Sequence, residues 1–142
     1  MSDKYLVDTN ILVYAHDTSA GEKHLRAKAL VEDLWRSRSG VVSTQVLQEL
    51  CVNIRRKVKH PVDLRTTREI VADYLSWIVV TNTGEAILDA LQIEEHYQIS
   101  FWDALVIHAA ESSGAAVLYS EDLSHGQTYR GVRVINPLKS MP

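Results

Sequence analysis

The sequence predicts an α/β fold, a three-layer α/β/α sandwich around a central five-stranded, mainly parallel sheet. Short apolar segments alternate along the chain with segments of helical period, which is the pattern of βα units. The apolar segments are nearly continuous rather than alternating, as expected for strands covered on both faces. A length of 142 residues with 46% hydrophobic and 23% charged residues matches one ordinary globular domain. We therefore expect a single domain over residues 1–142.

Five short apolar segments are predicted as strands. The first ends at three polar residues, Asp8, Thr9 and Asn10, and the second begins at Gly40. The third and fourth each follow a helical segment, and the fifth lies close to the C-terminus. In chain order the predicted strands cover residues 4–8, 40–43, 77–81, 115–119 and 132–135.

Five segments between and beside these strands are predicted as helices from their apolar spacing and their end signals. Thr44 is the expected cap of the second, Asp63 opens the third, and Gly114 ends the last. The predicted helices cover residues 22–38, 44–56, 63–76, 84–97 and 100–113.

Several classes of protein are excluded by what the chain lacks. A lone cysteine, Cys51, forms no intramolecular disulfide framework and suits a reducing compartment. We find no signal peptide, no apolar stretch long enough to span a membrane, no zinc-type histidine spacing and no glycine-rich phosphate loop. We therefore expect a cytoplasmic protein that does not contact a membrane.

The net charge of −3 argues weakly against a nucleic-acid partner, but the charges are unevenly distributed. Residues 23–68 hold eleven Lys and Arg against four acids, whereas residues 69–122 hold ten acids and no Lys or Arg. Such a basic cluster is either an anion-binding surface or a solvated helix end. Its densest part comprises Arg55, Arg56, Lys57, Lys59, Arg65 and Arg68.

Four carboxylates occupy similar places in the predicted fold. Asp8 ends the first strand, Asp122 follows the fourth, Asp103 lies in the first turn of the last helix, and Glu49 lies in the helix after the second strand. Ligands of open α/β sheets collect beyond the carboxyl ends of the strands, where the strand order switches. Converging carboxylates repel one another unless a cation is present, and Mg²⁺ and Mn²⁺ prefer oxygen ligands.

Each of these acids also has a structural explanation, and singly that explanation is the better one. Asp8 can cap a turn or helix beginning near Asn10, and Ser100 with Asp103 fits a capping box. Trp102 can stack on a base, but packing in the core is the favoured role. Taken together, the four acids favour a site because all of them fall where this architecture binds its ligands.

The sequence resembles the PIN-domain family of metal-dependent ribonucleases. Its length is similar to that of the VapC toxins of toxin–antitoxin pairs. The resemblance covers nearly the whole chain. Four segments carry it: Val7-Asp8-Thr9-Asn10-Ile11-Leu12, Gln48-Glu49-Leu50, Phe101-Trp102-Asp103-Ala104-Leu105 and Ser120-Glu121-Asp122-Leu123.

The resemblance implies a metal-dependent endoribonuclease that hydrolyses RNA with Mg²⁺ or Mn²⁺, a small antitoxin partner and a homodimer. It implies that the metal-binding and catalytic acids are Asp8, Glu49, Asp103 and Asp122. Positioning roles fall to Thr9, Asn10 and Ser120. The residues expected to bind RNA phosphates are Arg55, Arg56, Lys57, Lys59, Arg130 and Arg133.

Three alternatives remain open at this stage. A PIN-like module that binds nucleic acid or protein without cleaving it would have the same fold. A solitary RNA-processing nuclease would have the same site without an antitoxin. A phospho-receiver domain is disfavoured, because Thr9 stands where it needs a second acid and Lys139 is a poor match for its lysine.

Overall fold

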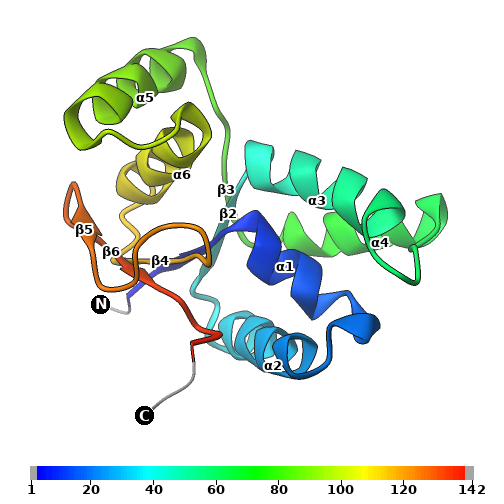
Figure 1. The fold of residues 1–142 in the computed structure, drawn as a ribbon. Helices are drawn as coiled ribbons and strands as arrows, with labels where there is room; N and C mark the ends of the chain where they lie inside the picture. The colour runs from blue at the N-terminus through cyan, green and yellow to red at the C-terminus, as the bar shows by residue number, and fades with distance from the viewer. Residues whose placement is uncertain (1–2, 140–142) are drawn as a thin grey trace.

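A computed structural model describes residues 3–139 of the chain, and it confirms the α/β class. Strands and helices alternate along most of the chain (Figure 1). The strands are β1 (Tyr5–Val7), β2 (Gly40–Ser43), β3 (Ile78–Val80), β4 (Val117–Tyr119), β5 (Thr128–Tyr129) and β6 (Val132–Ile135). The helices are α1 (Thr9–Ala15), α2 (Glu22–Ser37), α3 (Thr44–Arg56), α4 (Leu64–Tyr74), α5 (Gly84–Tyr97) and α6 (Phe101–Ser112), with a 3₁₀ turn, η1, at Thr18–Ala20.

The strands form one sheet in the order β3-β2-β1-β4-β6-β5. All neighbours are parallel except the short β5, which pairs antiparallel with the edge of β6. The described residues therefore contain six strands rather than the expected five, because the chain folds back through a two-residue strand before β6. β1 lies at the centre, with β2 on one side and β4 on the other.

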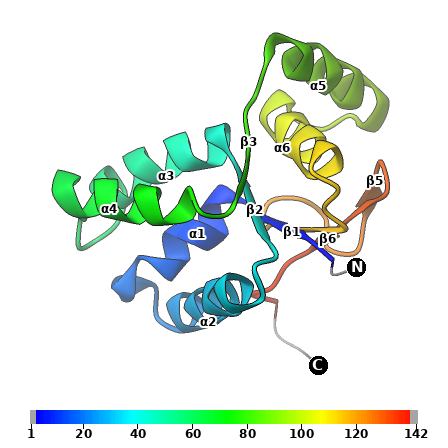
Figure 2. The ribbon, with the colours of Figure 1, turned by 180° about the vertical axis from the view of Figure 1, so that it is seen from behind.

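Helices cover both faces of the sheet, as the apolar strands require. α5 and α6 pack together on one face, and α1, α2, α3 and α4 lie on the other (Figures 1 and 2). Successive strand residues face opposite layers. In β1, accordingly, Leu6 joins the core beneath α5 and α6, whereas Val7 joins the core beneath the other four helices. The three-layer prediction is confirmed.

Most helices begin at a side-chain cap that satisfies a free backbone N–H group. Ser100 accepts from the amide of Asp103 and Asp63 accepts from that of Thr66, as the sequence predicts. The expected cap Thr44 is wrong by one residue. Ser43 caps α3 by accepting from Val46, and Thr44 is the first helical residue.

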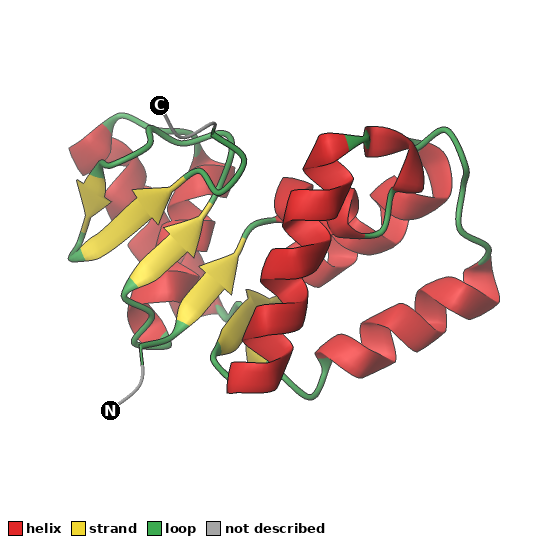
Figure 3. Ribbon diagram, turned by 90° about the horizontal axis from the view of Figure 1, so that it is seen from below, coloured by secondary structure: helices red, strands yellow, loops and turns green. Residues whose placement is uncertain are grey.

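The short helix α1 begins immediately after β1, and the sequence indicates it only as a possible segment near Asn10. It leads from the carboxyl end of β1, the central strand, into the layer formed by α1, α2, α3 and α4. The arrowheads in Figure 3 mark the carboxyl ends of the strands. In residues 3–139, no helix is long and apolar enough to cross a membrane.

Candidate active site

The candidate site lies where the sheet changes direction. From β1 the strand order runs one way to β2 and β3 and the other way to β4 and β6, so the switch point lies between β1 and β4. Asp8 follows β1 and Ser120 follows β4, and the amide of Asp8 donates to the carbonyl of Tyr119 at 2.9 Å. The two neighbouring strands therefore deliver their following residues to one edge of the sheet.

Asp8 is the buried member of the site, with 7% of its surface exposed. Its Oδ1 accepts from the amide of Thr9 at 2.8 Å, and its Oδ2 accepts from the hydroxyl of Ser120 at 3.1 Å. Burial, helped by the charges of Asp122 and Asp103 and opposed by these two hydrogen bonds, raises the pKa of Asp8 to about 6. Asp8 is therefore both the N-cap of α1 and a carboxylate whose ionised form is disfavoured by its surroundings.

Glu49 reaches the same region from α3. The hydroxyl of Thr9 donates to its Oε1 at 2.8 Å, and the amide of Gln45, one helical turn earlier, lies 3.5 Å from the same atom. The backbone of Thr9 binds Asp8 while its side chain binds Glu49, so one residue joins the two acids.

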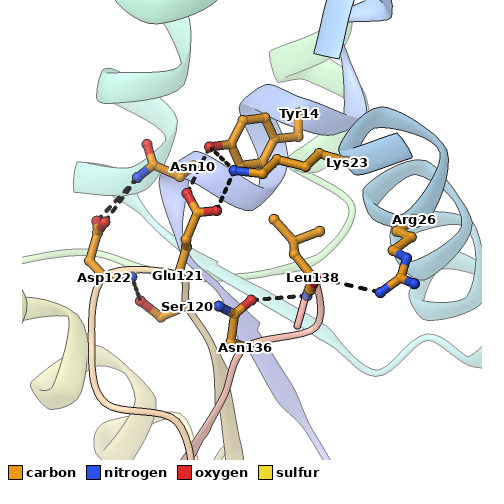
Figure 4. A network of polar contacts seen from close by, with 9 residues as sticks. All are labelled: Asn10, Tyr14, Lys23, Arg26, Ser120, Glu121, Asp122, Asn136 and Leu138. Atoms are coloured by element: carbon orange, nitrogen blue, oxygen red, sulfur yellow. Dashed lines mark hydrogen bonds and ion pairs between the residues drawn. The ribbon is translucent and has the colours of Figure 1, made fainter. Parts of the chain in front are cut away.

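Asp122 is exposed and is held from the first turn of α1 (Figure 4). The amide of Asn10 lies 3.2 Å from both carboxylate oxygens of Asp122. The hydroxyl of Ser120 accepts from the amides of Asp122 and Leu123 while it donates to Asp8. Because Ser120 is fully buried, its hydroxyl fixes the turn after β4 against the end of β1.

Asp103 enters from the first turn of α6, behind the cap of Ser100. The pKa of its carboxyl is raised, mainly by partial burial and also by the charge of Asp122. A hydrogen bond with Ser100 opposes this rise. Asp103, Asp122 and Asp8 are therefore close enough to repel one another. This convergence comes from helix packing across the sheet.

The donor set suits a hard divalent cation that keeps part of its water shell. In the described part of the chain, no Lys or Arg forms an ion pair with any of the four acids. No three His, Cys, Asp or Glu side chains of residues 3–139 are arranged so that they could hold a metal ion by themselves. Mg²⁺ does not need such a cage, because it commonly binds one or two carboxylates together with water and substrate phosphates. The carboxylates therefore fit Mg²⁺ or Mn²⁺ in an open site.

A second polar network borders the site and escapes sequence reasoning. Tyr14 donates to Glu121 at 2.7 Å, and Lys23 forms an ion pair with the other oxygen of Glu121 at 2.9 Å (Figure 4). Although partial burial raises it, hydrogen bonds from Lys23 and Tyr14 hold the pKa of Glu121 below its ordinary value. The side chain of Glu121, the residue before Asp122, is thus bound to residues of α1 and α2. Its position beside Asp122 is the only sequence signal.

The basic residues expected at the RNA surface divide into two groups. Arg56, Lys57 and Lys59 are exposed beyond Glu49, toward and past the end of α3, and Arg55 is half-buried with its Nε donating to the carbonyl of Cys51. Arg133 is exposed on β6. Arg130 differs from all of these, because its guanidinium is already paired.

Arg130 joins the β5–β6 turn to the helical layer. Its Nη1 lies 2.9 Å and 3.0 Å from the oxygens of Asp89 and 3.0 Å from Glu111, and its backbone amide donates to Tyr97. Its charge is therefore compensated within the fold, and we do not include it among the phosphate-binding residues.

Trp102 also departs from expectation. The sequence favours a core position, but 62% of its surface is exposed. The reason is its place in α6: Ala104 and Leu105 fill the inward face, and the helix turns Trp102 away from it.

Comparison with known families assigns most of the chain. A family model described as the PIN domain matches residues 5–130. A search of curated proteins finds no match.

Several solved structures share the fold at low sequence identity. VapC20 from Mycobacterium tuberculosis, described as a sarcin–ricin loop cleaving toxin, is 22% identical, with a TM-score of 0.64 over 84% of this chain and 90% of that one. A toxin–antitoxin complex from Klebsiella pneumoniae is 16% identical, with a TM-score of 0.70 over 94% and 98%. A DNA-bound VapBC complex from Salmonella typhimurium is 19% identical, with a TM-score of 0.63 over 94% and 97%.

Proposed function

Because the chain belongs to the PIN-domain family, we propose that it is an endoribonuclease that depends on Mg²⁺ or Mn²⁺. The observation that carries this proposal is the convergence of Asp8, Asp103 and Asp122 at the switch point, with Glu49 tied to Asp8 through Thr9. Bringing these charges together destabilises the fold in the absence of a cation. Such an arrangement is typical of a functional site rather than of a structural one.

In this proposal Asp8, Glu49, Asp103 and Asp122 line the metal site, one or two of them binding the ion directly and the others through its water shell. A bound Mg²⁺ or Mn²⁺ supplies an activated water nucleophile and neutralises charge on the phosphate that is attacked. The chain's other residues orient the ligands: Thr9 holds Glu49, Asn10 holds Asp122, and Ser120 holds Asp8. The network around Glu121 keeps a fifth carboxylate turned away from these four.

We place the RNA backbone along α3, from the carboxylates toward the basic residues that follow. Arg56 lies seven residues beyond Glu49, roughly 10 Å along the helix axis. Exposed cations at that spacing suit phosphates flanking the cleavage site. The proposed phosphate-binding residues are Arg55, Arg56, Lys57 and Lys59, with Arg133 as a separate contact.

We further propose that the chain is the toxin of a toxin–antitoxin pair and forms a homodimer. The likeness of its fold to VapC20 and to two toxin–antitoxin complexes supports the first part. Co-expression with the product of any short reading frame found next to its gene tests it. A toxin yields a stable complex in which RNA cleavage is suppressed, whereas a solitary nuclease yields neither.

The nuclease proposal is tested by cleavage of a labelled RNA with Mn²⁺ or with EDTA. We expect cleavage that requires the metal and is lost in Asp8→Asn. The matched control is Asp33→Asn, an exposed acid on α2 that pairs with Arg36, and it should cleave normally. RNA binding without cleavage by the wild type would instead support a non-cleaving binding module.

A further inference from the structure

Trp102 has an unusual position for a large aromatic side chain. The ten Phe, Trp and Tyr residues all lie within the described range, and Trp102 is the only one that is exposed. The other two tryptophans, Trp35 and Trp77, pack against Tyr74 in the core. The fold therefore leaves its one free aromatic surface in the first turn of α6, immediately before the carboxylate Asp103.

Contacts hold this part of α6 in place. The amide of Gln45 lies 3.5 Å from the carbonyl oxygen of Trp102 and also 3.5 Å from Glu49. The ring of Phe101, itself half-buried, meets the indole edge-on with centroids 5.3 Å apart. Gln45 thus links the backbone of Trp102 to Glu49, one proposed metal ligand. The residue after Trp102 in the chain is Asp103, another proposed ligand.

We infer that Trp102 is a stacking platform for an unpaired RNA base next to the scissile phosphate. The inference rests on the proposed function, since it needs a phosphodiester at the carboxylates. Every base has an aromatic face, and stacking on an exposed indole requires a base that is not already stacked in a duplex. The base that stacks on Trp102 must therefore be unpaired.

The location of Trp102 favours RNA over a protein partner. The more continuous exposed apolar surface lies elsewhere, on α5, where Ile87, Leu88 and Leu91 are exposed at helical spacing. Trp102 instead precedes the carboxylate Asp103 in the first turn of α6, and Gln45 links its backbone to Glu49, so a protein covering this region would have to bury charged groups at a cost. A nucleotide brings a flat apolar base and an anionic phosphate together, and this matches an indole beside a cation site.

The test is binding of a labelled 20-nucleotide RNA of mixed sequence, in Ca²⁺, with intact RNA verified on a gel. We compare the wild type with Trp102→Ala and Trp102→Phe. Leu88→Ala, which removes an equally exposed apolar side chain at 65% exposure, is the matched control. Each variant is also measured with the same strand annealed as a duplex and with a strand of abasic nucleotides, and its oligomeric state is measured by light scattering.

We expect Trp102→Ala to weaken binding of the single strand about 5- to 150-fold, the range for loss of one stacked base. Trp102→Phe should restore most of the affinity, and Leu88→Ala should change nothing. The abasic strand should bind wild type and Trp102→Ala alike. Unchanged affinity in Trp102→Ala, or an equal loss with the abasic strand, overturns the inference. So does a change in oligomeric state without a change in RNA affinity, which would make Trp102 a protein contact.

These outcomes separate the inference from the proposed function. If the wild type cleaves RNA with Mn²⁺ but Trp102→Ala binds RNA normally, only the stacking inference fails. If the wild type neither cleaves nor binds RNA, both fail.

Discussion

Replacing Asp8 by Asn should stabilise the metal-free protein at neutral pH. The pKa of Asp8 is about 6 in the fold against 3.8 for an unperturbed Asp, so the folded state holds this proton more tightly than the unfolded state does. As pH rises from about 4 to 6, the unfolded chain loses the proton first, and the native state loses stability relative to it. Above pH 6 the full cost is present, about 3 kcal/mol from the two pKa values.

The substitution does not recover all of that cost. Oδ1 and Oδ2 of Asp8 both accept hydrogen bonds, whereas an Asn amide offers only one acceptor oxygen. Ser120 already accepts from two backbone amides, so it is poorly placed to accept a third bond, and this loss offsets about 1 kcal/mol. We expect Asp8→Asn to be more stable by about 2 kcal/mol at pH 7, or about 6 °C in Tm.

The assay is urea unfolding in EDTA at pH values from 4 to 7.5, with Asp33→Asn as the surface control. The stability difference between Asp8→Asn and wild type should be near zero or negative at pH 4 and grow to its full value by pH 7. Asp33→Asn should show little such growth, because its carboxylate is exposed. A difference that is independent of pH, or a variant less stable than wild type at pH 7, would refute the electrostatic argument.

Three further predictions test the surroundings of the site. Ser120→Ala should lose about 1–3 kcal/mol of stability, measured by urea unfolding, because it leaves two buried backbone amides and one oxygen of Asp8 unpaired. Gly40→Ala should lose about 1–3 kcal/mol in the same assay, because an added Cβ would lie 2.5 Å from the Trp77 ring. Arg130→Ala should lose about 1 kcal/mol and leave RNA affinity, measured by anisotropy, unchanged, since its charge is used within the fold.

Much of the fold is predictable because its signals are local. Alternation of apolar strands with capped helices predicts α5 and β6 at their observed bounds, and it predicts a mainly parallel sheet. The pairing of β1 with β4 is a property of the folded sheet that the sequence does not predict. The two-residue strand β5 carries no periodic pattern, so its pairing depends on the turn that Gly131 makes with a φ of 79° and cannot be seen in the sequence.

The candidate site is likewise predictable from the sequence only in part. Asp8, Asp103 and Asp122 stand out in the sequence because each one follows a strand or opens a helix, whereas Glu49 lies within α3 and stands out mainly through the family resemblance. The neighbouring network around Glu121 is not predictable, since Tyr14 and Lys23 meet Glu121 across about a hundred residues of chain. The same holds for Trp102, because the apolar stretch that follows it hides the fact that α6 turns this one side chain outward.

Binding of Mn²⁺ without RNA tests the central claim most directly, namely that these carboxylates form one metal site. Electron paramagnetic resonance of free Mn²⁺ gives the affinity of the wild type, of Asp8→Asn and Asp122→Asn, and of the control Asp33→Asn. We expect the first two variants to bind Mn²⁺ at least about 10-fold more weakly than wild type and the control to bind it equally well. Equal affinity in Asp8→Asn and the wild type, or no uptake by the wild type at millimolar Mn²⁺, would contradict the account.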